Sequence, residues 1–127
     1  MNISVAADAA GLPVKTVRYY ADIGLVAAPS RSASGYRTYD DASIRKLAFI
    51  RRAREFGFNI GECRELLGLY EDQNRSSADV KQIASKKLEE IRAKQRELQA
   101  LHDDLSHLVD SCSGDHQPEC PIIDYLG

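Results

Sequence analysis

Residues 14–26 read VKTVRYYADIGLV, the pattern of a short amphipathic helix. Val14, Val17 and Ala21 recur at the spacing of a single helical face, so we expect this face to be buried. Gly24 is expected to end the helix, because glycine readily adopts the left-handed backbone conformation found at a helix C-terminus. The opposite face of the helix then remains available for binding.

Another short helix is expected before this one. The segment Ser4–Ala10 is rich in alanine, and Gly11 ends it. Pro13 stands at the expected first position of the following helix, where the missing N–H of proline is tolerated. Two short helices joined by a tight turn that contains glycine have the outline of a helix-turn-helix.

A small hairpin is expected after the two helices. Pro29 and the turn at Ser34–Gly35 interrupt any helix. Residues 34–40 read SGYRTYD, and the aromatic residues favour a strand at Tyr36–Tyr39 that pairs with Val26–Ala28. Such a hairpin would form a wing beside the helix-turn-helix.

The exposed face of the 14–26 helix carries charged and aromatic side chains. Lys15, Arg18, Tyr19 and Asp22 fall at i, i+3, i+4 and i+7, opposite the apolar stripe. Basic residues near the N-terminus of an exposed helix suit the major groove of DNA, whereas Tyr19 could equally pack against the protein. Arginine charges and tyrosine hydroxyls also suit phosphate contacts. The further candidates are Arg31, Tyr36 and Arg37 on the hairpin and Arg51, Arg52 and Arg54 on the next helix.

The net charge of the whole chain argues against DNA binding. The 127 residues carry a formal charge of −2, whereas nucleic-acid-binding modules are usually basic. The average hides a division, because residues 1–64 hold ten Lys and Arg against six Asp and Glu, and residues 65–127 hold seven against thirteen. The basic N-terminal half suits DNA binding, and the acidic C-terminal half indicates a second function.

Two further helices with side-chain caps are expected behind the hairpin. Asp40 is expected to cap a helix that ends near Phe56. Asn59 and Glu62 have the spacing of a capping box, which predicts a fourth helix that continues to about Tyr70.

A long helix is expected from Ser76 to about residue 110. A heptad seam runs through positions 84, 88, 91, 95, 98, 102, 105 and 109, which is typical of a coiled coil. A helix of roughly 35 residues is about 50 Å long, too long for so small a domain to cover. We therefore expect a homodimer, in which Gln95 and His102 on the seam set the register of the two helices.

Cys112 and Cys120 lie in the loop after the long helix, with seven residues between them. Thiolates are soft ligands, but two are too few for a four-thiolate zinc site or an iron–sulfur cluster. They suffice for a monovalent ion, whose negatively charged complex needs a positive surrounding. The long-helix N-terminus at Ser76 and Ser77 and the nearby Lys81 could supply it. The spacing alone does not distinguish this site from two free thiols in a tail.

Two other candidate ligands receive simpler interpretations. His116 lies inside the same loop, and we expect an exposed polar residue there rather than a third ligand. Cys63 lies in the fourth helix, and we expect a buried thiol that packs in the core.

Together these segments resemble the MerR family of transcriptional regulators. The resemblance rests on VKTVRYYADIGLV, SGYRTYD, the arginine-rich RRAREFGFN and the long helix, and so extends over essentially the whole chain. It implies a winged helix-turn-helix dimer on an inverted-repeat operator. It also implies that Lys15 and Arg18 lie near bases or adjacent phosphates, and that Tyr20, Tyr36 and Arg37 hold phosphates.

The segment CSGDHQPECPII resembles the metal loop of the copper-responsive branch of this family. The resemblance implies that Cys112 and Cys120 bind Cu(I), with Ag(I) or Au(I) as mimics. It places the loop of one subunit against the dimer-helix N-terminus of the other, with Ser77 and Lys81 around the ligands. Sensors of divalent ions in this family have a third cysteine where this chain has Ser77. Metal binding is implied to distort promoter DNA so that RNA polymerase can use it.

The expected fold is mainly α. A winged helix-turn-helix domain with connecting helices occupies residues 1–75, and an antiparallel coiled-coil dimerisation helix occupies 76–110. A metal-binding loop with a short final helix from Pro121 occupies 111–127.

The expected function is copper-responsive activation of transcription in the cytoplasm. No apolar run approaches the roughly 18 residues of a membrane helix, and the N-terminal segment lacks the pattern of a signal peptide. No nucleophile–base set, phosphate loop or catalytic carboxylate pair appears, so an enzyme is not expected. The alternatives are a regulator that responds to Zn(II) or to thiol oxidation, and a cytosolic copper buffer or chaperone without a DNA role.

Overall fold

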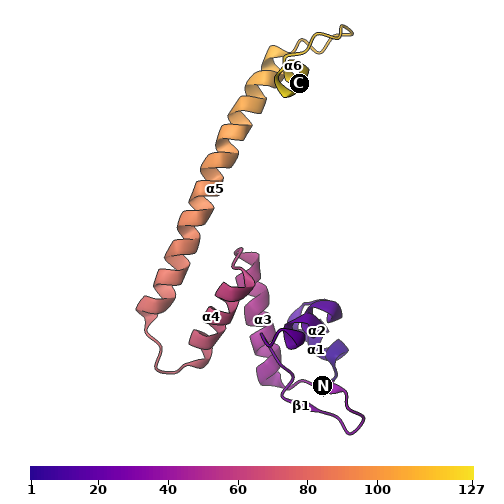
Figure 1. The fold of residues 1–127 in the computed structure, drawn as a ribbon, viewed down its shortest axis with the longest axis vertical. Helices are drawn as coiled ribbons and strands as arrows, with labels where there is room; N and C mark the ends of the chain where they lie inside the picture. The colour runs from indigo at the N-terminus through magenta and orange to yellow at the C-terminus, as the bar shows by residue number, and fades with distance from the viewer. The chain divides into compact units, whose positions relative to one another are not determined.

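The computed structural model describes all residues, 1–127, and contains six helices and two short strands (Figure 1). In chain order they are α1 (Ile3–Ala10), α2 (Val14–Asp22), β1 (Ser30–Arg31), β2 (Arg37–Thr38), α3 (Asp41–Glu55), α4 (Ile60–Glu71), α5 (Ser77–Ser111) and α6 (Pro121–Leu126). The chain forms two compact units, Met1–Ile83 and Ala84–Gly127. None of the helices combines the length and the apolar character needed to cross a bilayer.

The first two helices form the expected helix-turn-helix. The side chain of Asn2 caps α1 by accepting a hydrogen bond from the backbone N–H of Val5, and Gly11 ends the helix with a positive φ of 74°. Pro13 is the N-cap of α2 rather than its first helical residue, because its ψ of 146° is extended. From this position its carbonyl accepts the N–H of Val17, which starts the helical hydrogen-bond ladder.

The wing is a two-stranded antiparallel hairpin in which Ser30 pairs with Thr38 and Arg31 with Arg37. The expectation that Val26–Ala28 forms the first strand is wrong. Val26 is 3% exposed, and its backbone N–H bonds to the carbonyl of Tyr20, so it closes the end of α2 and packs in the core instead.

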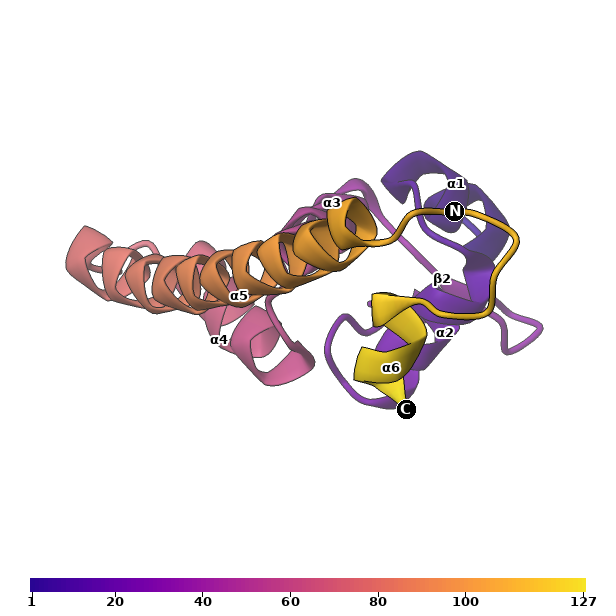
Figure 2. The ribbon, with the colours of Figure 1, turned by 90° about the horizontal axis from the view of Figure 1, so that it is seen from above.

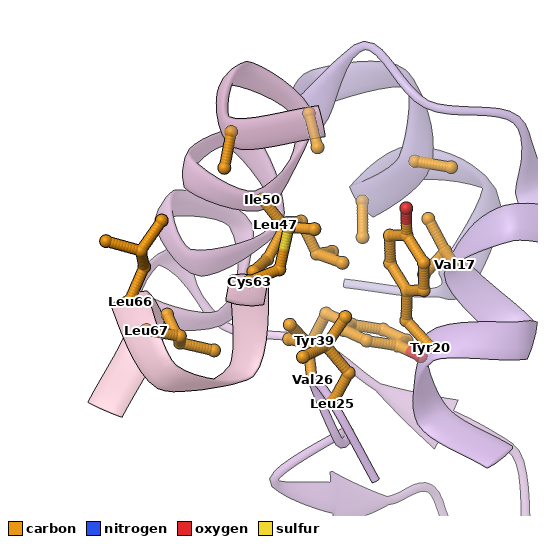
Figure 3. Packing of buried hydrophobic residues seen from close by; sticks show 14 of the residues in the cluster. Val17, Tyr20, Leu25, Val26, Tyr39, Leu47, Ile50, Cys63, Leu66 and Leu67 are labelled. Atoms are coloured by element: carbon orange, nitrogen blue, oxygen red, sulfur yellow. The ribbon is translucent and has the colours of Figure 1, made fainter. Parts of the chain in front are cut away.

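The core of the first unit gathers apolar side chains from α1 to α4 around α3. Figure 3 shows side chains from α2, α3, α4 and the segment between α2 and β1 meeting in one cluster. Its labelled members are Val17, Tyr20, Leu25, Val26, Tyr39, Leu47, Ile50, Cys63, Leu66 and Leu67. The expectation for Cys63 is confirmed, because its side chain is fully buried and its thiol contacts the carbonyl of Phe58 at 3.7 Å.

The predicted caps of α3 and α4 are confirmed. The Asp40 carboxylate accepts hydrogen bonds from both the backbone N–H and the hydroxyl of Ser43. The backbone bond is the main cause that holds the pKa of Asp40 below its ordinary value. Asn59 and Glu62 form a complete capping box at the start of α4.

Helix α5 contains 35 residues and begins one residue later than expected. Ser76 precedes it, and its hydroxyl accepts a hydrogen bond from the backbone N–H of Ala78. Along the C-terminal part of α5, large apolar side chains are more than half exposed, namely Leu98, Leu101, Leu105 and Val109. An exposed apolar face of this kind is typical of a helix that packs against another element, and the homodimer stays a prediction.

Candidate DNA interface and thiol loop

A cleft of about 690 Å³ lies on the first unit, between the start of α1, helix α2 and the wing. Helix α2 is the second helix of the helix-turn-helix and is called the recognition helix below. Three arginines line it, one from α2 and two from the wing strands. The full lining is Asn2, Ile3, Ser4, Arg18, Arg31, Ser32, Gly35, Tyr36, Arg37 and Thr38. Three guanidinium groups around one cleft create a positive surface that suits an anionic backbone.

The two wing arginines are held by hydrogen bonds on the protein itself. Arg31 donates from Nη1 to the carbonyl of Gly35 at 2.9 Å, across the turn of the hairpin. Arg37 donates from Nη2 to the carboxylate of Asp22, the last residue of α2, at 2.6 Å. The wing is therefore tied to the recognition helix by an ion pair.

The three tyrosines considered for DNA binding, Tyr19, Tyr20 and Tyr36, occupy different environments. Tyr36 at the wing turn is 75% exposed and Tyr19 on α2 is 52% exposed, so both reach solvent. Tyr20 is only 5% exposed, and its ring belongs to the core. Burial raises the pKa of Tyr20, while Arg54 beside its hydroxyl opposes that rise. Tyr20 therefore offers little exposed surface to DNA, and its phosphate contact stays a prediction.

Three arginines donate hydrogen bonds to backbone carbonyls of the protein itself. Arg51 donates to the carbonyl of Ala10 at 3.0 Å, and Arg54 donates to that of Phe58 at 2.8 Å. Arg64 of α4 donates from both terminal nitrogens, at 3.1 Å, to Ile23 and Gly24 at the end of α2. A cation is favourable at a helix C-terminus, as at Ala10 and Ile23. Arg51 and Arg64 therefore help to hold the helix-turn-helix together. Arg54 spans the turn between α3 and α4, and its phosphate contact stays a prediction.

The first turn of α1 is the part of the cleft that sequence reasoning missed. Asn2 and Ser4 line the cleft beside Arg18. The signal was present, because Asn2 stands directly before an apolar helical segment as an N-cap residue does. Lys15 is exposed on α2 but does not line this cleft.

In the second unit, the loop after α5 returns so that its two cysteines meet. Figure 2 shows this loop between the end of α5 and α6. Cys112 directly follows α5, and Cys120 is the N-cap of α6. Their sulfur atoms lie 3.2 Å apart, both cysteines are half-buried, and neither forms a disulfide. The fold of the loop therefore joins two thiols that are eight positions apart in the sequence.

The two thiols differ in acidity. The backbone N–H of Ile123 is the main cause that lowers the pKa of Cys120, and the thiol of Cys112 and the N–H of Ile122 act in the same direction. The hydrogen bond with Cys120 is the main cause that raises the pKa of Cys112. Cys120 is thus the sulfur that ionises first.

The donor set of this loop fits a soft ion that accepts two sulfurs. No group of three or more His, Cys, Asp or Glu side chains assembles anywhere in the chain. His116 is exposed on the loop, as expected. Cys112 and Cys120 would hold such an ion, and their sulfur atoms already face each other at 3.2 Å.

Comparison with family models identifies the chain. Residues 1–69 match the family described as MerR HTH family regulatory protein, and residues 44–108 match the one described as MerR, DNA binding. The chain belongs to the MerR family. The mainly helical fold, with its wing and long α5, is the fold of that family, and its members are DNA-binding transcriptional regulators rather than enzymes.

Similar MerR-family proteins cover nearly the whole chain. The transcriptional regulator HmrR of Rhizobium leguminosarum bv. viciae is 52% identical over 99% of this chain and 97% of its own length. The regulator CueR of Salmonella typhimurium is 47% identical over 99% of this chain and 91% of its own length. The crystal structure of the regulator PbrR691 from Ralstonia metallidurans CH34 in complex with lead(II) has a TM-score of 0.84 at 33% identity, covering 100% and 99% of the two chains.

Proposed function

We propose that this protein is a homodimeric transcriptional activator that binds promoter DNA and responds to Cu(I), or to Ag(I) or Au(I), through Cys112 and Cys120. The observation that carries the proposal is the pair of thiols, whose sulfur atoms lie 3.2 Å apart in a chain that also has a winged helix-turn-helix. Similarity to a relative named heavy metal-dependent transcription regulator 2, from Rhizobium meliloti, and to the lead(II)-bound PbrR691 supports a heavy-metal ligand. The charge of the site and the number of its sulfur donors favour a monovalent one.

The second subunit completes the metal site in this proposal. A monovalent ion between two thiolates leaves a net negative charge, which needs a positive surrounding. Ser77 and Lys81 are exposed in the first turns of α5, where helix N–H groups point outward. We expect the partner subunit to bring its copies of these two residues to the loop. Serine at position 77, in place of a third thiolate, favours a monovalent over a divalent ion.

The DNA contacts in this proposal follow the cleft and the exposed face of α2. Lys15 and Arg18 meet bases or adjacent phosphates, while wing residues grip the backbone. The wing residues are Arg31, Tyr36 and Arg37, and the hydroxyl of Tyr20 and the guanidinium of Arg54 provide further phosphate contacts. The exposed positions of Arg18, Arg31 and Tyr36 around one cleft support this assignment.

Activation in this proposal works through the shape of the DNA. Bending and untwisting a promoter costs about 1–6 kcal/mol, and the dimer must supply that energy from differential contacts. Bound Cu(I) supplies a soft cation that holds two thiolates together. A ligand shifts a conformational equilibrium only if it binds one state better than the other. Ordering of the Cys112–Cys120 loop is the source of that difference here, and RNA polymerase then uses the realigned promoter.

The test of the metal site is a competition for Cu(I) against a chromophoric Cu(I) chelator, under anaerobic conditions with a reductant that carries no thiol. We expect one high-affinity Cu(I) per chain, and we expect Cys112→Ser and Cys120→Ser each to abolish it. Cys63→Ala is the matched control, since this thiol is buried in the other unit and should leave binding unchanged. Equal affinity for Zn(II) and Cu(I), or full binding by either serine variant, would refute the assignment.

One alternative has a specific observation in its favour. Two thiols 3.2 Å apart can also form a disulfide, so the loop could sense oxidation instead of a metal ion. A copper buffer or chaperone without a DNA role is disfavoured by family membership. Binding to a duplex that the protein itself selects from a random-sequence pool, with affinity that falls as salt rises, excludes the buffer. Transcription that responds to peroxide but not to Cu(I) would favour the oxidation sensor.

A further inference from the structure

The recognition helix ends on a residue that its local environment disfavours. Asp22 is the last residue of α2, where the helix dipole favours a cation rather than a carboxylate. Its side chain is 55% exposed and pairs with Arg37, which lines the cleft proposed to receive DNA. A carboxylate near DNA phosphates is repelled by them, so Asp22 is unfavourable for both the helix and the DNA unless it serves another role.

The ion pair with Arg37 provides that role. The Nη2 atom of Arg37 lies 2.6 Å from the Asp22 carboxylate, and the guanidinium is more buried than its partner, with 26% of the side chain exposed. A guanidinium has five N–H donors in a fixed planar fork. The contact with Asp22 uses Nη2. The remaining N–H groups can therefore reach a phosphate while Asp22 holds the group in place.

Buried Tyr39, which follows β2 and exchanges two backbone hydrogen bonds with Met1, anchors the base of the wing, but the strands themselves give little further support. The wing strands have two residues each, and β1 is exposed on both of them. A two-stranded hairpin is marginally stable by itself. Contacts between the hairpin and the rest of the unit therefore decide where the arginines of the wing point, and the Asp22–Arg37 pair joins it directly to α2.

We propose that Asp22 is a positioning residue for DNA binding, which holds Arg37 of the wing at a fixed angle to the recognition helix so that both meet the same stretch of DNA backbone. The inference rests on the proposed DNA-binding function and deepens it. It predicts an effect opposite in sign to that of simple electrostatics, because removing a negative charge beside DNA should otherwise strengthen binding.

The test is a double-mutant cycle of Asp22→Asn and Arg37→Ala in the full-length protein. Affinity for the duplex selected from a random-sequence pool is measured by fluorescence anisotropy over a range of salt concentrations. Asp22→Asn should weaken binding about fivefold in the native background, a coupling typical of residues in contact. With Arg37→Ala already present, the same change should leave binding unchanged or strengthen it. Arg37→Ala by itself should reduce the slope of log affinity against log salt by about 1.

Two further variants make the outcome unambiguous. Asp8→Asn removes one exposed carboxylate from α1, away from the lining of the cleft, and should not weaken binding. Asp22→Ala is measured alongside Asp22→Asn, so that the test can still be made if one of the two variants folds poorly. Thermal unfolding checks that each variant is folded.

The contrary results separate three failures. Stronger binding by Asp22→Asn in the native background, or equal weakening in both backgrounds, overturns the positioning role. Unchanged affinity and salt slope in Arg37→Ala would instead overturn the placement of Arg37 at DNA. Absence of salt-dependent binding by the native protein would overturn the proposed function itself.

Discussion

Cys120 and Cys112 form an asymmetric pair, and this asymmetry is measurable in the metal-free protein. Backbone N–H groups lower the pKa of Cys120. The hydrogen bond between the two thiols raises the pKa of Cys112. A lower pKa gives a larger thiolate fraction at neutral pH, and the thiolate is the nucleophile. Alkylation by limiting iodoacetamide at pH 7 should therefore modify Cys120 first, as read by mass spectrometry of peptides. The preference should shrink as the pH rises above both pKa values.

A buried thiol in the same chain serves as the control. Cys63 is fully buried and should remain unmodified while the protein is folded. Faster modification of Cys112 than of Cys120 would contradict the assigned direction of the two shifts.

Tyr39 offers a residue-scale test of core energetics. Its side chain is 2% exposed, and its buried hydroxyl has no hydrogen-bond partner. A buried polar group without a partner costs about 1–3 kcal/mol. Tyr39→Phe should therefore raise the free energy of unfolding by about 1 kcal/mol, measured by urea denaturation. Tyr36→Phe, at a 75% exposed position, should leave it unchanged, and a destabilised Tyr39→Phe protein would show that the hydroxyl is paired.

At the residue scale, sequence identifies chemical types better than their partners. The buried state of Cys63 and the exposure of His116 followed from ordinary preferences of these residues. The carbonyl contacts of Arg51 and Arg64 were out of reach, because they join residues about 40 positions apart and depend on how the helices pack. The burial of the Tyr20 ring was equally a result of that packing.

At the element scale, helix α5 has an exposed apolar face that we expect a second subunit to bury. Leu98 and Leu105 lie one heptad apart on the predicted seam and are 68% and 55% exposed. Leu98→Glu would place a charge in the dimer interface and should shift the protein toward monomer, as measured by sedimentation velocity at several concentrations. Ala100→Glu is the matched control, because position 100 lies about 200° around the helix from position 98.

The outcome of this experiment bears on the predicted homodimer directly. Both variants should keep their helical content, since glutamate is a good helix former. An unchanged sedimentation coefficient for Leu98→Glu, in a protein that is dimeric before the change, would place the interface elsewhere.

Elements whose signals are local were the predictable ones. The Asp40 cap and the Asn59–Glu62 capping box each need only residues within one turn, and both formed as expected. The first wing strand was misplaced because strand pairing depends on distant residues. Val26 has a good strand side chain, but burying it against the helices of the core takes precedence over pairing.

At the scale of the whole molecule, each unit shows one half of the proposed response. The first unit presents arginines around a cleft, and the second brings two thiols within 3.2 Å. The negative overall charge was misleading because the two tasks are separated along the chain, with basic residues concentrated before residue 65. The proposed link between the two tasks runs through DNA and a second subunit.

The most direct test of that link is run-off transcription with purified RNA polymerase, on a promoter that carries the selected operator between its two polymerase-binding elements. The account predicts that Cu(I) increases the transcript in the presence of the native protein. Cys120→Ser should still bind the duplex with native affinity but give no increase. Equal induction of native and Cys120→Ser proteins by Cu(I), or no induction of a native protein that is bound to both DNA and Cu(I), would contradict it.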